Sequence, residues 1–466
     1  MLELIKSVFE SQQKYKLLLR KANAEIRISK LRILKKRIEN FEEELYTAMQ
    51  ADLRKCRFET AVTELLFTYA EIDFAVKHLE DWMKPKTVRA NPANFFARNK
   101  IYYEPKGVCL IIAPWNYPFQ LLISPLISAI AAGNCAILKP SELSSETAKV
   151  ISKLISATFQ PNEIACFLGD AGVSKDLLSL PFDHIFFTGS TLVGKIVMEA
   201  AAKNLSSVTL ELGGKSPVIV EASANLEKCA KKIAWGKLVN AGQTCIAPDY
   251  LLIDETLESQ FLTLYKDACN ALYFKDGKIN KEVYGKIINE KQFTRLTQLI
   301  KAAVSEGAEL AWGGSSEQEE DLTILPTVLR NVRPDNPIMK EEIFGPVLPI
   351  IVFKRLEEAI DLINQRNKPL ALYVFSENKD KVQKIIQETS SGGTCVNDVV
   401  IHISNPNLPF GGVNSSGMGS CHGIFGFKNF SHERAVVFQS KIGITSMIYP
   451  PYDKKMGLLK WLKKIL

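Results

Sequence analysis

Histidine is scarce in this sequence, and its cysteines show no regular spacing. The 466 residues include five His and nine Cys. No His lies in an HxxxH or mixed Cys/His spacing and no two Cys form a CxxC pair, so the sequence predicts no metal site. An odd number of unpatterned Cys also argues against a disulfide framework and favours a reducing, cytoplasmic setting.

The sequence also lacks a secretion signal and a long uninterrupted apolar run. The amino terminus, MLELIKSVFES, carries charges where a signal peptide needs an apolar core. The longest uncharged stretch, 107–138, is broken by three prolines and by Gly133. It is better interpreted as strand "VCLIIA", turn "PWNYP", helix "FQLLISPLISAIAAG" and strand "NCAILKP", a buried βαβ unit, than as a membrane span.

Positive charge is concentrated at the start of the chain. Residues 1–40 hold eleven Lys and Arg against four Glu, an excess that equals the net charge of +7 of the whole chain. The segment has helical periodicity and no RNA- or DNA-binding signature. We therefore expect a solvated basic helix face and no nucleic-acid partner.

Helix and strand patterns alternate along most of the chain. With 466 residues, 46% of them hydrophobic, the chain should divide into two or three domains. Amphipathic helices are expected within 2–82. From about residue 100, apolar strands such as "HIFFTGS" alternate with helices such as "TLVGKIVMEAAAKN". This order predicts an α/β fold with a mostly parallel, doubly wound sheet of the dinucleotide-binding type, followed by a second α/β region.

The stretch "FFTGSTLVGKI" resembles a phosphate-binding P-loop but lacks its last element. Gly189 and Gly194 are followed by Lys195, yet Ile196 stands where a P-loop needs Ser or Thr to hold magnesium. What remains is a strand-to-helix turn whose glycines would let a pyrophosphate or ribose approach the helix amino terminus. The alternative is an ordinary turn without a ligand.

Three further stretches hold residues suited to catalysis, and each has an alternative role in structure. Cys245 lies in the Gly-containing segment "VNAGQTCIAPDY", where a thiol can meet substrate. Glu211 ends an apolar strand in "TLELGGKSP", where a desolvated carboxyl group could act as a general base or be a satisfied structural Glu. Asn116 in "PWNYPF" offers a neutral donor for an oxyanion.

Taken together, the motifs identify a family resemblance. "PWNYPF", "LKPSE", "FTGS", "LELGGKSP", "NAGQTC", "EEIFGPV" and "LPFGGVNSSGMG" occur in the order and at the approximate spacing of the aldehyde dehydrogenase superfamily. The resemblance runs from "ADLRK" at residue 51 to "MIYPPYDKK" near the end. The short amino terminus, "GQTCIAPDY" and "YPPY" resemble the class 3 branch, which includes fatty aldehyde dehydrogenases.

The resemblance implies a chemical role for each of the three residues. Cys245 would be the nucleophile, Asn116 and the backbone N–H of Cys245 the oxyanion donors, and Glu211 the base that activates water to hydrolyse a thioester. The implied reaction is NAD(P)-dependent oxidation of an aldehyde to a carboxylic acid. Two alternatives remain: acyl transfer to coenzyme A, and an inactive scaffold at a membrane surface.

The family motifs also imply positions that contact the cofactor and the substrate. The implied cofactor-binding residues are Trp115, Lys139, Glu142, Gly189, Ser190, Gly194, Glu342 and Phe344. A carboxylate at Glu142 would accept from a ribose 2′-hydroxyl and repel a 2′-phosphate, which favours NAD, with NADP as the alternative. Tyr69, Tyr117 and Trp235 match the substrate-channel neighbourhood, although core packing is an alternative role for each.

The implied architecture has three parts. We expect an aldehyde dehydrogenase-like fold with a Rossmann-type NAD-binding domain at 1–209 and an α/β catalytic domain at 210–394. Bridging strands from 84–106 and 395–442 would cross a subunit interface, so the resemblance implies a homodimer. A tail at 443–466 would follow.

The tail "KKMGLLKWLKKIL" predicts a basic amphipathic helix. Its Leu, Trp and Ile side chains cover one arc of a helical wheel, and its Lys side chains cover the opposite arc. It could lie on an anionic membrane or dock on protein. Membrane contact would suit medium or long-chain aliphatic or otherwise apolar aldehydes as substrates, and would make the cytoplasmic protein peripherally membrane-associated.

Overall fold

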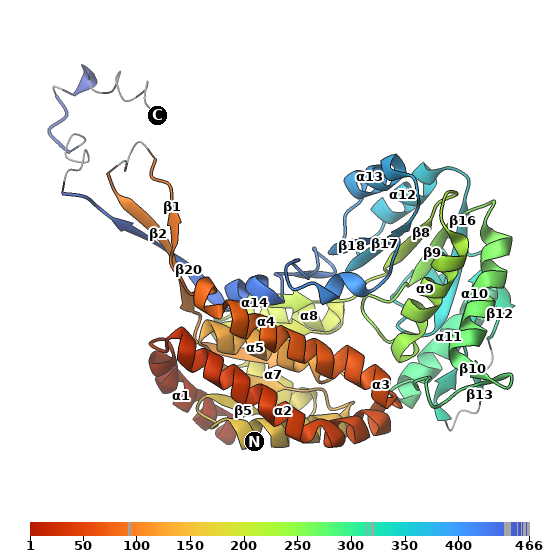
Figure 1. Cartoon of the computed structure of the whole chain (residues 1–466), viewed down its shortest axis with the longest axis horizontal. Coiled ribbons are helices and arrows are strands. Elements are labelled where there is room, and N and C mark those ends of the chain that lie inside the picture. The colour runs from red at the N-terminus through yellow and green to blue at the C-terminus, as the bar shows by residue number, and fades with distance from the viewer. Residues whose placement is uncertain are drawn as a thin grey trace.

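Two lobes and a projecting arm make up the chain. The structure, a computed structural model, describes all residues except 92, 93, 95, 315, 318–320, 442–448, 454, 458, 460–462 and 464–466. One lobe carries the amino-terminal helices and a six-stranded sheet, and the other carries a seven-stranded sheet. The arm extends away from both lobes (Figure 1).

Helices form the amino-terminal region, as predicted. They are α1 (Leu2–Leu19), α2 (Ala24–Leu53), α3 (Arg57–Thr60), the π-helical turn η1 (Ala61–Leu65) and α4 (Leu66–Trp82). α2 packs on α6 of the first lobe and α4 packs on α5. α2 and α4 therefore form a layer over these helices on one side of the six-stranded sheet, whereas α1 packs with α7 on the other side.

The six-stranded sheet has the predicted doubly wound topology. Its strands lie in the order β19-β7-β6-β3-β4-β5, and only β19 is antiparallel to its neighbour. Their bounds are β3 (Val108–Ile112), β4 (Cys135–Lys139), β5 (Ile164–Cys166), β6 (His184–Thr188), β7 (Ser207–Glu211) and β19 (Gly417–Met418). The connecting helices are α5 (Gln120–Ala132), α6 (Ser145–Thr158), α7 (Ala171–Leu178) and α8 (Thr191–Ala202).

The strand order places a ligand crevice at one position of this sheet. From β3 the chain adds β4 and β5 on one side, then crosses over to add β6 and β7 on the other. In open α/β sheets the crevice lies at the carboxyl ends of the strands where the order reverses. Here that position lies between β3, which leads to Asn116, and β6, which leads to Gly189.

The second lobe is built around a seven-stranded sheet in the order β12-β15-β16-β9-β8-β17-β18, parallel except for β12. The strands are β8 (Pro217–Val220), β9 (Tyr250–Asp254), β12 (Glu309–Trp312), β15 (Thr327–Arg330), β16 (Val347–Phe353), β17 (Ala371–Phe375) and β18 (Gly393–Val396). The helices are α9 (Leu226–Leu238), α10 (Glu258–Tyr273), α11 (Glu290–Ser305), α12 (Leu356–Asn364) and α13 (Lys379–Glu388).

Short elements complete this lobe and its junction with the first. They are η3 (Val239–Gly242), β10 (Phe274–Lys275), β11 (Lys278–Ile279), β13 (Ser316–Glu317), β14 (Thr323–Ile324), η5 (Pro337–Met339), η6 (Ile401–Ser404) and α14 (Gly423–Asn429).

The arm is an antiparallel sheet of β1 (Lys86–Val88), β2 (Arg98–Pro105) and β20 (Ser431–Phe438). Of the range 395–442 expected to bridge, only 431–438 joins this sheet. Residues 417–418 pair with β7, and α14 packs on α4 and α5 of the first lobe. The apolar face of α14 explains this difference, since Phe427 is buried among those helices. The domain boundaries themselves remain predictions, and most of the predicted tail helix lies outside the described residues.

Candidate active site

A cavity of about 220 Å³ lies where the two lobes meet at the carboxyl ends of β3, β6 and β7. It brings together all three residues expected to act on the substrate, Asn116, Glu211 and Cys245, and most of the expected cofactor contacts. Its lining is Pro114, Trp115, Asn116, Leu121, Thr188, Gly189, Ser190, Glu211, Leu212, Gly213, Cys245, Gln292, Glu342 and Phe344.

Cys245 lies in a tight turn just before β9. The backbone N–H of Ala247 donates to the carbonyl of Thr244 (2.9 Å), which closes the turn around the partly buried thiol. Burial raises the pKa of Cys245 to about 12, and the nearby carboxyl groups of Glu342 and Glu211 act in the same direction. The backbone N–H groups of residues 245 and 246 offset part of this increase. The thiol is therefore protonated at neutral pH.

Asn116 lies beside Cys245 because its side chain is hydrogen-bonded to the segment that carries the thiol. Its Nδ2 donates to the carbonyl of Gln243 at 3.0 Å, and the residue is only 2% exposed. An amide nitrogen has two N–H groups, so this bond leaves one available to the cavity. That group is suited to stabilise an oxyanion formed on a carbonyl bound at the thiol.

Glu211 ends β7 with a buried and unpaired carboxyl group. It is 5% exposed, and neither of its oxygens has a hydrogen-bond partner among the described residues. Burial raises the pKa of this carboxyl group well above its ordinary value, and the nearby Cys421 thiol acts in the opposite direction. A carboxyl group in this state can take a proton from water near neutrality, as a general base must.

The turn after β6 has the form expected for a nucleotide site. Ser190 caps α8, its Oγ accepting from the backbone N–H of Val193 (3.4 Å). Gly194 does not line the cavity; a Cβ there would lie 2.7 Å from Leu212 Cδ2, so this glycine permits close packing of α8 on the end of β7. The amino terminus of α8 is exposed, and its backbone N–H groups can bind an anionic group.

Lys139 and Glu142 lie just outside the cavity lining. Lys139 Nζ contacts Glu142 Oε2 at 3.3 Å and donates to the carbonyl of Pro140 at 2.8 Å. Lys139 is buried, whereas the side chain of Glu142 is 45% exposed. The exposed carboxylate is thus available to a ribose hydroxyl at the edge of the crevice.

Two aromatic rings and an acidic group also line the cavity. Trp115 and Phe344 lie edge to face with ring centroids 5.4 Å apart. Glu342 lies against Gly213, where a Cβ would come within 2.1 Å of Glu342 Oε2. Burial raises the pKa of Glu342 to about 8, and Asp249 acts in the same direction. The glycine therefore leaves room for a carboxyl group that faces the cavity.

The three aromatic residues expected near the substrate line neither this cavity nor the adjoining one. Tyr117 is buried and its Oη contacts Thr244 Oγ1 at 2.7 Å. Tyr69 on α4 donates to Glu42 (2.6 Å), and Trp235 on α9 is 38% exposed. Their role in substrate binding remains a prediction.

A smaller inner cavity of about 30 Å³ shares Glu211 and Cys245 with the first and extends toward α14. The sequence analysis missed several of its residues. Those from the carboxyl-terminal part of the chain are Ile403, Phe410, Cys421 and His422. The motif "LPFGGVNSSGMG" contains Phe410 and ends close to Cys421, but a motif alone does not indicate which of its side chains point inward.

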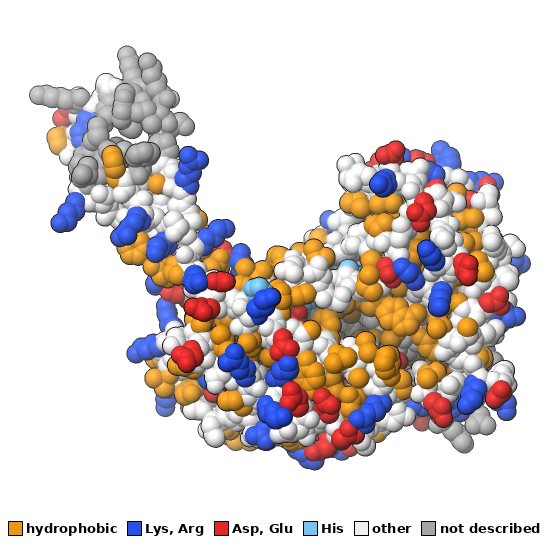
Figure 2. Space-filling model, viewed as in Figure 1, with side chains coloured by type: hydrophobic (Ala, Val, Ile, Leu, Met, Phe, Trp, Pro, Cys, Tyr) orange, Lys and Arg blue, Asp and Glu red, His pale blue; other side chains and the backbone are white. Residues whose placement is uncertain are grey.

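On the face seen in Figure 2, Lys and Arg lie interspersed with Asp and Glu over the amino-terminal helices. Within the described part of the chain, no cluster of His, Cys, Asp and Glu could hold a metal ion. No helix among those residues is long and apolar enough to cross a membrane.

Comparison with known proteins identifies the chain. The profile of the "Aldehyde dehydrogenase family" matches residues 3–436. The chain is 44% identical over 455 residues to 4,4'-diaponeurosporen-aldehyde dehydrogenase of Staphylococcus aureus, covering 98% of this chain and 96% of that protein. It is 44% identical over 427 residues to aldehyde dehydrogenase family 3 member A2 of Macaca fascicularis, covering 91% and 87%.

Among solved structures, a substrate-bound state of Staphylococcus aureus AldH superposes with a TM-score of 0.94 at 42% identity, covering 98% of this chain and 99% of that one. These matches confirm the predicted fold class, family and class 3 resemblance.

The raised pKa of Cys245 predicts a steep pH dependence of its alkylation. Without cofactor, the rate of Cys245 modification by iodoacetamide should rise about tenfold per pH unit from pH 7 to 10 without a plateau, since the thiolate fraction is small below the pKa. Quantitative mass spectrometry of the peptide containing residue 245 would measure this rate. Glu342→Gln and Glu211→Gln should each increase it at a fixed pH. A plateau below pH 9 would contradict the burial argument.

Proposed function

The chain belongs to the aldehyde dehydrogenase family and oxidises aldehydes, and we propose that it does so through a thiohemiacetal and a thioester on Cys245. The products would be carboxylic acids, and the preferred substrates medium or long-chain aliphatic or otherwise apolar aldehydes. One observation carries the mechanism: Cys245, Asn116 and Glu211 line a single cavity.

The first part of the proposed reaction takes place between Cys245 and Asn116. Cys245 first releases its proton to solvent, and the thiolate Sγ then attacks the carbonyl carbon and forms a thiohemiacetal. The resulting oxyanion accepts from the free N–H of Asn116 and from the backbone N–H of Cys245. Each such donor typically contributes of the order of 10²-fold to the rate. The thiohemiacetal carbon then gives up a hydride, which leaves a thioester on Sγ.

The cofactor is NAD(P), as in the family, and we propose a preference for NAD. When bound, nicotinamide supplies the acceptor for the departing hydride. The residues described in the crevice fit such a group: the capped amino terminus of α8 suits a pyrophosphate, and Glu142 suits an unmodified ribose. Glu342 and Phe344 would border the nicotinamide end. A 2′-phosphate would meet the charge of Glu142, which supports NAD over NADP.

Glu211 supports hydrolysis as the second part. Its unpaired carboxylate, with a raised pKa, can remove a proton from a water molecule as that water attacks the thioester. This releases the carboxylic acid and the Cys245 thiolate. Transfer to coenzyme A needs no such base, so the presence of Glu211 favours water as the acceptor.

An apolar substrate is supported by the inner cavity. Its lining includes the apolar side chains Leu121, Leu370, Ile403 and Phe410 beside Cys245. Burial of an alkyl chain against such side chains would contribute about 0.8 kcal/mol per methylene group. The staphylococcal relative is named for 4,4'-diaponeurosporen-aldehyde, and this name points to the same class of substrate.

Two proposals concern assembly. We propose a homodimer formed through the arm, because its sheet projects from the lobes and exposes Val437 and Phe438. We also propose peripheral membrane contact through the basic amphipathic tail, which would supply lipid-dissolved aldehydes.

An aldehyde panel tests the proposed reaction. We expect reduced nicotinamide to form with hexanal, decanal and benzaldehyde, with kcat/KM higher for decanal than for hexanal and NAD preferred to NADP. Added coenzyme A should leave the carboxylic acid as the product. Formation of an acyl-CoA would favour the transferase alternative. The absence of reduced nicotinamide with every aldehyde would favour the scaffold alternative.

Substitution of the two reacting groups separates acylation from hydrolysis. Cys245→Ala should abolish reduced nicotinamide formation. Glu211→Gln should retain a rapid burst of about one equivalent per site and slow the later steady state by about 10² to 10⁴ fold, because only deacylation needs the base. Stopped-flow absorbance would measure both phases. A Gln variant that turned over at the normal rate would show that another group activates the water.

The tail can be tested by deletion. Full-length protein should co-sediment with vesicles of phosphatidylcholine and phosphatidylserine, and less with phosphatidylcholine alone. A chain truncated after Asp453 should stay in the supernatant while retaining its kcat for soluble hexanal. Equal partitioning of the two proteins would rule out membrane contact through the tail.

A further inference from the structure

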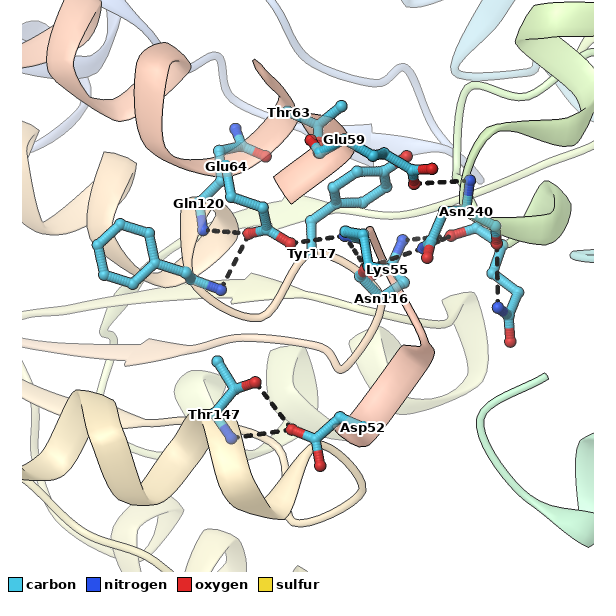
Figure 3. Close-up of polar contacts among 12 residues, drawn as sticks. Asp52, Lys55, Glu59, Thr63, Glu64, Asn116, Tyr117, Gln120, Thr147 and Asn240 are labelled. Carbon is cyan, nitrogen blue, oxygen red and sulfur yellow. Dashed lines mark hydrogen bonds and ion pairs between the residues drawn. The ribbon is translucent and has the colours of Figure 1, made fainter. Parts of the chain in front are cut away.

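A fully buried ion pair lies close to the active site, between Lys55, just after α2, and Glu64 in η1. Lys55 Nζ lies 2.7 Å from Glu64 Oε1, and neither side chain is exposed. Neither residue lines the catalytic cavity. Figure 3 shows the pair next to the loop that carries Asn116.

Both members of the pair hold the backbone around Asn116. Lys55 Nζ donates to the carbonyl of Asn116 at 3.1 Å and lies 4.0 Å from the ring centroid of Tyr117. Glu64 Oε2 accepts from the backbone N–H groups of Phe119 (3.2 Å) and Gln120 (2.9 Å). The loop from β3 to α5 is thus fixed by a cation at its middle and by an anion at the amino terminus of α5.

A third residue connects the same carbonyl to the loop that carries the nucleophile. Asn240 Nδ2 donates to the carbonyl of Asn116 at 2.9 Å and to the carbonyl of Gln243 at 3.1 Å. Its backbone N–H donates to the partly buried carboxyl group of Glu59 at 2.9 Å (Figure 3). The backbone of Asn116 is therefore held from two sides, while its side chain bonds Gln243 and faces the cavity.

We propose that the Lys55–Glu64 ion pair is a positioning element of the reaction, which holds the Asn116 amide at the oxyanion through the backbone of residues 116–120. A buried ion pair gains little net stability over apolar side chains of similar size, because desolvation offsets most of the attraction. Its contribution here is to fix the position of the Asn116 amide. Oxyanion donors act only when placed within a few tenths of an ångström, and a misplacement of about 1 Å can cost a hundredfold in rate.

This inference depends on the proposed role of Asn116, and the experiment separates the two. The variants are Lys55→Met, Glu64→Gln and the pair K55M/E64Q, which leaves no unpaired buried charge. Asn116→Ala is the reference variant. We expect the burst rate of reduced nicotinamide formation to fall by about ten to a hundredfold in K55M and in K55M/E64Q. The dissociation constant for NAD should change less than twofold.

The decisive measurement repeats these substitutions in the Asn116→Ala background. If the pair acts by placing that amide, K55M and K55M/E64Q should there change the burst rate by less than threefold. The same fold loss in both backgrounds would overturn the proposal, as would K55M and K55M/E64Q burst rates within twofold of wild type. An unchanged burst rate in Asn116→Ala itself would instead overturn the oxyanion role of that residue.

Asp52 provides a matched control on the same turn. It is a buried carboxylate that accepts from the backbone N–H groups of Glu146 (3.2 Å) and Thr147 (2.8 Å), and so caps α6 in the way that Glu64 caps α5. Asp52→Asn should lower the thermal midpoint as much as Glu64→Gln does, yet leave the burst rate within twofold of wild type. An equal loss of burst rate in Asp52→Asn would show that general loosening, not placement of Asn116, causes the effect.

Discussion

The hydrogen bond from Asn116 Nδ2 to the carbonyl of Gln243 holds the active site together. The donor belongs to the first lobe, on the loop between β3 and α5, and the acceptor belongs to the second lobe, two residues before Cys245. Neither lobe contains a complete site. The spacing between thiol and oxyanion donor is consequently a property of the junction, and the junction must be stiff for the reaction to be fast.

Burial has opposite consequences for the groups in this cavity. It makes Glu211 a better base, because the carboxylate loses hydration and its pKa rises. It also holds the Cys245 thiol protonated, and the charge of Glu211 adds to this effect. Each negative charge in this cavity therefore makes ionisation of the Cys245 thiol more costly. The buried environment that suits the Glu211 carboxyl group to hydrolysis thus keeps the Cys245 thiol protonated until its surroundings change.

Much of this arrangement could be predicted from the sequence. Apolar periodicity gave the alternation of strands and helices, and long motifs identified Cys245, Glu211 and Asn116. Their proximity could not be predicted from periodicity, because it depends on how β7 and the turn before β9 meet across the lobes. The ring contacts of Tyr69 and Trp235 could not be predicted either, since family resemblance places a residue on a helix but does not say which neighbour its ring contacts. The range 395–442 was expected to bridge, yet its elements are divided: β18 and η6 lie in the second lobe, β19 and α14 pack on the first lobe, and β20 joins the arm.

The positioning residues around Lys55 were beyond sequence reasoning for a different reason. In the sequence, "ADLRK" marks only the start of a resemblance, since a lysine beside an arginine normally indicates a solvated surface. The backbone after α2 turns through a left-handed Arg54 (φ 51°) and directs successive side chains to different partners. Asp52 caps α6, and Lys55 points inward to the ion pair with Glu64. Between them, the Arg54 guanidinium donates to the carbonyls of Tyr284 and Gly285 in the second lobe. A single turn thereby ties both lobes to the loop of the oxyanion donor, and the rigidity that the chemistry needs arises from side chains that never touch the substrate.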